Sequence, residues 1–180
     1  MKTINKYITL FACCLAALSS CVKQKLEVEY TNQETKIESY VTKTKKDTMT
    51  VTYNNGSTRL TLKPGSGEAL DQDGAVSFYY AGYVFNGSIS DANLFVTNHM
   101  ATAEKARWDL TDADYSIYET DLRDAKLLEG VRNGLKGVRA GEECEILFTG
   151  KYGFGNSSFG IIPANSALAF KIWVVGVSND

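Results

Sequence analysis

The sequence contains few residues of the kinds that enzymes use for covalent or acid–base catalysis. Its single histidine is His99, and three of its four cysteines fall within the first 21 positions, which leaves Cys144. A nucleophilic cysteine needs a basic partner, and His99 lies in a polar segment with no spacing relation to Cys144, so the sequence argues against thiol catalysis. Cys144 alternates with Ile146 and Phe148, and this period of two predicts that Cys144 packs in a core.

Runs of lysine or arginine are also absent. The chain has 19 basic and 21 acidic side chains, for a net charge of −2. Such a chain lacks a cluster of positive charge that could bind a phosphate backbone, so we expect no nucleic-acid partner. With only two prolines, 44% apolar residues and 22% charged residues, the composition is typical of a folded globular protein. The length of 180 residues predicts one domain with a modest extension.

No apolar run reaches the roughly 20 residues that a membrane-spanning helix needs. Instead, Lys2 and Lys6 precede an apolar stretch over residues 8–18 and then small residues, which predicts a cleaved secretion signal over residues 1–20. The signal ends in Leu-Ser-Ser-Cys21, which resembles the lipobox of bacterial lipoproteins. That resemblance implies that Cys21 is lipidated and anchors the protein in the cell envelope, at an outer membrane facing the periplasm or the surface. The alternative is an ordinary signal that happens to end at a cysteine.

The segment after the signal predicts a stalk followed by a helix and hairpin extension. Residues 21–32 are polar and show little apolar periodicity, as expected of a flexible stalk. Ile37 and Val41 then recur at helical spacing, which predicts a short amphipathic helix over residues 33–45. Two β-rich runs, residues 48–53 and 57–62, flank Asn-Asn-Gly, a sequence that favours a tight hairpin turn. We therefore expect an extension over residues 33–73 and a main domain over residues 74–180.

The main domain shows the alternation of an antiparallel sheet and one short helical segment. Residues 75–81 alternate, and a second turn is expected at Asn86-Gly87. Helical spacing predicts a helix over residues 129–138, and alternation predicts strands over residues 143–149 and 167–177. Together they indicate an α+β fold in which an antiparallel sheet wraps one short helix.

Residues 88–117 form a polar segment longer than an ordinary connection, which is typical of a functional flap or a surface excursion. Several aspartates follow one another there and just beyond it. A loop beginning at Asp112 would place Ile117 where an EF-hand requires glycine and Arg123 where it requires glutamate. We therefore expect no metal site.

Two blocks of the main domain resemble the FKBP-type peptidyl-prolyl cis-trans isomerases, the macrolide-binding immunophilins. Residues 76–87 read VSFYYAGYVFNG, and residues 127–177 contain, in order, LLEG, AGE, YGFG, GIIP and LAF. Such an ordered series is improbable by chance. The resemblance implies a twisted antiparallel sheet around one helix, isomerisation of prolyl bonds, and partners that are proline-containing polypeptides and macrolide ligands. It implies no cofactor and no metal.

The resemblance also implies which residues form the site. The catalytic group would be Tyr80, Phe95, Phe154 and Phe170. The substrate-binding group would be Leu127, Leu128, Val131, Ile161 and Ile162, with the backbone N–H of Leu128 holding a substrate carbonyl. Taken one at a time and without the ordered motif, each of these residues is better interpreted as packed in a core, since alternating aromatic residues usually face one.

The sequence departs from the family pattern at three positions. Phe154 replaces a tyrosine and loses its hydroxyl, and Val131 replaces an aromatic floor and leaves a roomier site. At the third position either Phe95 supplies the ring without a carboxylate or Asp91 supplies the acid without a ring, and we favour Phe95 because the pocket needs an apolar wall. Tyr115 or Ile117 would supply a further wall.

Prolyl isomerisation suits a site without histidine, serine or metal. The barrier to rotation about an X-Pro bond, about 20 kcal/mol, comes from amide resonance, so no covalent bond has to form or break. An apolar pocket favours the twisted amide, which has lost charge separation. The sequence thus favours an isomerase that assists the folding of exported proteins. The alternatives are a binding or chaperone module with little turnover, and a structural surface lipoprotein whose motif is accidental.

Overall fold

The computed structural model describes the backbone of residues 2–111 and 113–179, with side chains from residue 23 onward. The signal and the proposed lipidation site at Cys21 lie outside the described side chains. Over the described ranges the helices are α1 (Lys2–Thr44), α2 (Met100–Lys105) and α3 (Glu129–Leu135), with short 3-10 turns at Asp91–Asn93 and Gly150–Tyr152. The strands are β1 (Thr50–Asn54), β2 (Ser57–Lys63), β3 (Ala75–Val84), β4 (Leu94–Thr97), β5 (Tyr118–Asp121), β6 (Glu143–Phe148) and β7 (Leu168–Ser178).

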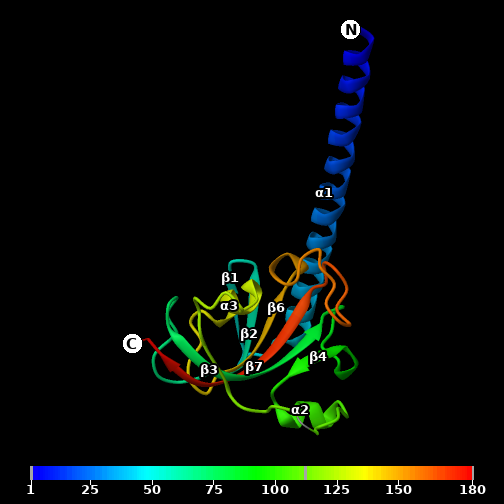
Figure 1. The fold of residues 1–180 in the computed structure, drawn as a ribbon. Coiled ribbons are helices and arrows are strands. Elements are labelled where there is room, and N and C mark those ends of the chain that lie inside the picture. Colours follow the sequence, from blue (N-terminus) through cyan, green and yellow to red (C-terminus); the bar gives the residue numbers. More distant parts are fainter. Residues whose placement is uncertain (1, 112, 180) are drawn as a thin grey trace.

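One antiparallel sheet organises the molecule, in the order β1-β2-β6-β7-β3-β4, with β5 pairing the start of β3. The long strands β3 and β7 cross its centre (Figure 1). The inward residues of β6 and β7 are buried as their alternation predicts: Cys144, Ile146, Phe148, Leu168, Phe170, Ile172 and Val174. The α+β fold with a sheet around a short helix is confirmed.

Helix α3 packs unusually close to β6 because its facing positions are glycines. A Cβ at Gly130 would overlap the ring of Phe148, and a Cβ at Gly134 would overlap Ile146. Leu135 on the same helix is fully buried in the core. Burial also raises the pKa of the Cys144 thiol well above its usual range, so this cysteine is an inert core residue.

The predicted hairpin forms around Asn55 and Gly56, both with positive φ (44° and 85°). It is not a separate extension, because β2 pairs along its length with β6. Arg59 of β2 donates hydrogen bonds to the carbonyls of Gly134 and Lys136, at 2.8 and 2.7 Å, and so holds the end of α3. The hairpin is thus part of the sheet that surrounds α3.

Helix α1 differs from the prediction because it is continuous through residues 21–32, where we expected an irregular stalk. Its apolar face starts before Gln33, at Tyr30, and continues with Ile37 and Val41, all buried. Ile37 and Val41 belong to a cluster with Leu147 and other residues on the face of the sheet opposite α3. The N-terminal half of the helix extends away from the sheet (Figure 1). Within the part searched, no helix combines the length and apolarity needed to span a bilayer.

Candidate functional site

An apolar cavity of about 700 Å³ opens between α3, the central strands and two loops. That volume is within the range of about 300–1,000 Å³ typical of small-molecule sites. All nine residues predicted for the site line this one cavity: Tyr80, Phe95, Leu127, Leu128, Val131, Phe154, Ile161, Ile162 and Phe170. The tertiary structure therefore gathers side chains from positions 80 to 170 around one hollow.

The strand side of the cavity is built from aromatic rings on β3, β4 and β7. Phe170 lies opposite Gly82 in the β3–β7 pair, and a side chain at position 82 would collide with the rings of Phe170 and Phe95. The glycine lets these rings meet edge to face, with centroids 5.8 Å apart. Burial raises the pKa of Tyr80 above its ordinary value, so its hydroxyl stays protonated and can donate a hydrogen bond at neutral pH.

Asn98, which the sequence analysis missed, fixes the backbone beside Tyr80. This buried side chain accepts a hydrogen bond from the Tyr80 N–H at 2.6 Å and donates one to the Ser116 carbonyl at 2.9 Å. It thereby ties β3 to the segment that leads into β5, where Tyr118 adds a ring 5.9 Å from Tyr80. A single polar residue just after a short strand carried no sequence signal for this role.

The opposite side of the cavity is the N-terminal end of α3. Leu128 is the N-cap residue of the helix, with extended φ and ψ of −55° and 137°. An amide at a helix start has no partner within the helix, so the Leu128 N–H is placed to donate to a bound carbonyl. Leu127 precedes it, and Val131 lies one turn further along with its side chain buried.

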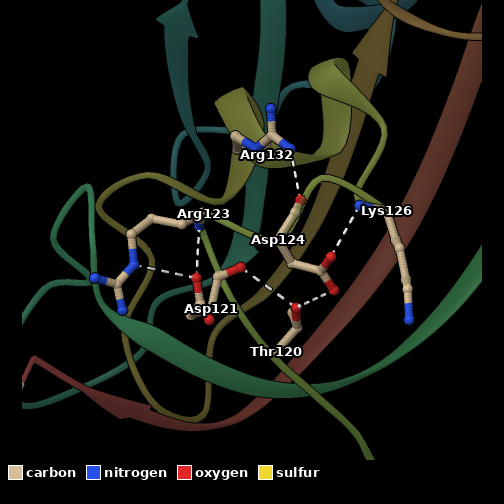
Figure 2. A network of polar contacts seen from close by, with 6 residues as sticks. All are labelled: Thr120, Asp121, Arg123, Asp124, Lys126 and Arg132. Atoms are coloured by element: carbon tan, nitrogen blue, oxygen red, sulfur yellow. Dashed lines mark hydrogen bonds and ion pairs between the residues drawn. The ribbon is translucent and has the colours of Figure 1, made fainter.

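A polar network shapes the turn that leads into Leu127 and Leu128. Figure 2 shows Asp124 at its centre. Its carboxylate accepts hydrogen bonds from the Lys126 N–H at 2.9 Å and the Thr120 hydroxyl at 3.2 Å, and its carbonyl accepts one from Arg132 of α3 at 2.6 Å. The hydrogen bond from the Lys126 N–H is the main cause that lowers the pKa of the Asp124 carboxyl. The turn is thus tied to both β5 and α3.

The remaining wall is the loop between β6 and β7. Phe154 stacks on Phe159 with centroids 5.4 Å apart, and Phe159 and Ile162 exchange backbone hydrogen bonds at 3.0 and 2.9 Å. Ile162 is buried, whereas Phe159 and Ile161 are each 66% exposed. This loop therefore closes the cavity with Ile162 and presents apolar side chains at its mouth.

The structure also shows which of the residues left as alternatives by the sequence line the cavity. Asp91 lies at the surface and pairs with Lys105 at 3.0 Å, whereas Phe95 lines the cavity. Among the described residues, Tyr115 and Ile117 are outside the lining, and other residues supply the additional wall: Phe78, Trp108 and Tyr118. Phe78 shares the face of Tyr80 and was predictable from alternation, but Trp108 lies in the long segment whose path the sequence did not predict.

The chemistry of this cavity is that of binding and orientation. Aromatic and aliphatic walls exclude water, a helix-start amide and a tyrosine hydroxyl supply donors, and the thiol of Cys144 is buried away from it. Such a site suits a compact apolar ring flanked by peptide carbonyls.

Comparisons with known proteins show relatives in sequence and in fold. FK506-binding protein 1 of Yarrowia lipolytica is 25% identical over 125 residues, which cover 68% of this chain and 99% of that protein. The crystal structure of FkpA from Escherichia coli matches 94% of this chain and 70% of its own with a TM-score of 0.56 at 18% identity. The N-terminal domain of FKBP42 from Arabidopsis thaliana matches 75% of this chain and 96% of its own with a TM-score of 0.58 at 15% identity.

A family model provides the assignment. The model described as FKBP-type peptidyl-prolyl cis-trans isomerase matches residues 65–175, which is more than half of the chain and contains every residue predicted to line the cavity. The chain therefore belongs to the FKBP-type peptidyl-prolyl cis-trans isomerase family.

Proposed function

We propose that this protein isomerises X-Pro bonds in exported polypeptides, from a position in the cell envelope to which a lipid on Cys21 anchors it. The observation that carries the proposal is the convergence of Tyr80, Leu128, Ile162 and Phe170 on one apolar cavity. The signal-like residues 1–20 and the lipobox-like end at Cys21 support the location.

The mechanism follows from the origin of the energy barrier to rotation about the prolyl amide bond. Rotation about the prolyl amide costs about 20 kcal/mol because resonance must be broken, and the twisted amide has less charge separation than the planar one. A water-poor cavity with aromatic walls binds that twisted form better than water solvates it, while the Leu128 N–H holds a substrate carbonyl. The Tyr80 hydroxyl provides a second donor on the opposite wall.

The direct test is a protease-coupled isomerisation assay on a proline tetrapeptide with purified residues 22–180. We expect catalysed cis-trans conversion that the macrolide FK506 inhibits, together with an FK506-dependent rise in melting temperature, because a ligand of the native state must raise it. Conversion at the uncatalysed rate would contradict the isomerase proposal. Binding of FK506 without conversion would favour the second candidate function.

That second candidate is a binding or chaperone module. It is favoured by two observations: Phe154 lacks the hydroxyl that the family's tyrosine would provide, and Phe159 and Ile161 expose apolar surface at the mouth. Suppression of aggregation of an unfolded protein, undiminished by a saturating macrolide and without peptide isomerisation, would identify this function. Isomerisation of the tetrapeptide excludes it as the sole activity.

A further inference from the structure

The loop of residues 150–165, here called the rim loop, is a closed unit whose two ends touch. A Cβ at Gly150 would overlap the backbone of Asn165, so only glycine allows this approach. The Asn165 N–H donates to the Gly155 carbonyl at 2.6 Å, and Asn165 has a positive φ of 57°. Between these ends lie five residues of the cavity lining: Phe154, Phe159, Gly160, Ile161 and Ile162. The geometry of the loop ends therefore determines where this wall of the cavity stands.

A side chain from α1 bridges both ends of the rim loop. The amide of Gln33 donates to the Asn165 carbonyl at 2.7 Å and accepts from the Gly150 N–H at 2.9 Å. One turn earlier, the hydroxyl of Tyr30, a buried residue, donates to the Asn165 side-chain oxygen at 3.0 Å. Figure 1 shows the orange segment that contains this loop lying against α1. Both polar atoms of one side chain are thus used to hold a loop more than 110 positions away in the sequence.

The helix is a fixed support for these contacts. Ile37 and Val41 are buried against the outer face of the sheet, and Tyr40 donates to the Glu145 carboxylate at 2.8 Å. The ring of Tyr40 also meets that of Phe85 edge to face, with centroids 5.4 Å apart. Because α1 is held by the sheet, Gln33 ties the rim loop to the same sheet that carries Tyr80 and Phe170.

We propose that Gln33, assisted by Tyr30, is a positioning residue that sets the affinity of the cavity for the residues flanking the substrate proline. It acts through the rim loop, because it keeps Ile162 in the cavity wall and Ile161 at the mouth. This proposal rests on the proposed isomerase function. It predicts an effect on substrate binding, since Gln33 lies on the outer face of the sheet and cannot touch the rotating amide.

The test uses the full chain in mild detergent, with Gln33→Ala, Tyr30→Phe and the matched control Gln24→Ala, an exposed glutamine on the same helix. We expect Gln33→Ala to raise KM for a proline tetrapeptide, and the Kd for FK506, about three- to tenfold, the scale of one or two lost hydrogen bonds. We expect kcat to stay within about twofold. Tyr30→Phe should shift both constants in the same direction by less. Gln33→Glu keeps an acceptor for the Gly150 N–H but places a carboxylate oxygen against the Asn165 carbonyl, so its KM should rise at least as much as that of Gln33→Ala.

Two further readouts separate positioning from a structural role. Amide exchange within residues 150–165 should speed up in Gln33→Ala and not in Gln24→Ala. In a cycle with Ile161→Ala, the effect of Gln33→Ala on KM should shrink, because both act on the same wall. A lowered melting temperature with unchanged KM and Kd, or equal effects of Gln33→Ala and Gln24→Ala, would overturn the proposal. If the wild type shows no turnover, the proposed function fails, and the Kd and exchange measurements still decide whether Gln33 positions the loop.

Discussion

Tyr80 and Phe170 contribute to the cavity in a way that Phe154 does not. Each stands on a central strand whose backbone pairs on both sides, so its ring has a fixed position in the wall. Phe154 stands on a loop and is held by stacking on the exposed ring of Phe159. A rigid ring preorganises a site better than a ring on a loop, so the two strand residues should carry more of the activity.

Alanine at Tyr80 or Phe170 should lower kcat/KM for a proline tetrapeptide at least about tenfold, which corresponds to 1.4 kcal/mol of lost transition-state binding. Phe154→Tyr should retain the wild-type value or exceed it, because it restores a donor while keeping the ring. Circular dichroism and melting curves should accompany the kinetics to confirm folding. A Tyr80→Ala variant that folds and turns over normally would refute the site assignment.

We expect Asp124 to make a pH-dependent contribution to stability. Its folded pKa is lowered, first by the Lys126 N–H, so the ionised carboxylate stabilises the folded state above the unfolded pKa of about 3.9. This contribution is lost as the pH falls through the folded value. The melting temperature of the wild type should exceed that of Asp124→Asn at pH 7, and the difference should shrink towards zero below about pH 4. A difference that is constant from pH 7 to pH 3 would show that the carboxylate charge plays no part.

At the scale of elements, the close contact between α3 and β6 positions one wall of the cavity. Gly130 and Gly134 allow the helix to lie directly on the rings and branched side chains of β6. The N-cap of the same helix is Leu128, which lines the cavity. Any separation of α3 from the sheet would therefore move the amide that we propose as the carbonyl donor.

Gly134→Ala should destabilise the fold by about 1–3 kcal/mol, because the added methyl must displace Ile146 in a packed core. Urea unfolding monitored by tryptophan fluorescence measures this change. Glu129→Gln, at an exposed position on the same helix, is the control and should stay within about 0.5 kcal/mol of the wild type. Equal midpoints for Gly134→Ala and the wild type would mean that the helix can move away from β6 at no cost.

On the scale of the whole molecule, the sheet separates the cavity from the helix that contains the predicted lipidation site. Its inner face holds α3 and the cavity, and its outer face holds α1, whose N-terminal part leads to the predicted lipidation site. Gln33 connects the two sides because it reaches the ends of the rim loop. The helix nearest the proposed anchor is therefore also in contact with the wall of the site.

If Cys21 carries the anchor, bacteria expressing the full chain should incorporate labelled palmitate into it, and the protein should sediment with membranes. Cys21→Ala should abolish labelling and move the protein to the soluble fraction. Cys144→Ala provides the matched control, because that thiol is buried in the core. Labelling that persists in Cys21→Ala would contradict the anchor at this position.

Much of the fold and the cavity was predictable from local patterns. Alternation identified β3, β6 and β7, and helical spacing identified α3. The two motif blocks identified eight lining residues without any coordinates, and the ninth, Phe95, was preferred over Asp91 because the pocket needs an apolar wall. These signals are informative because the period at which apolar residues recur indicates which side chains share a face of a strand or helix. A strand with one buried face also has a strongly specified register.

Other features depended on contacts between distant segments, which local patterns do not report. The polar residues that hold the site, Asn98 and Gln33, have partners 18 and more than 110 positions away, and Trp108 reaches the cavity from a segment without periodicity. The pattern of apolar and polar residues along the chain thus determined the sheet, the helix and the apolar wall of the cavity. It could do so because apolar residues that share one face of a strand or helix are buried together. Only the packed structure decided which polar groups meet, because a hydrogen bond depends on the positions of two particular atoms and not on a repeating property of the chain.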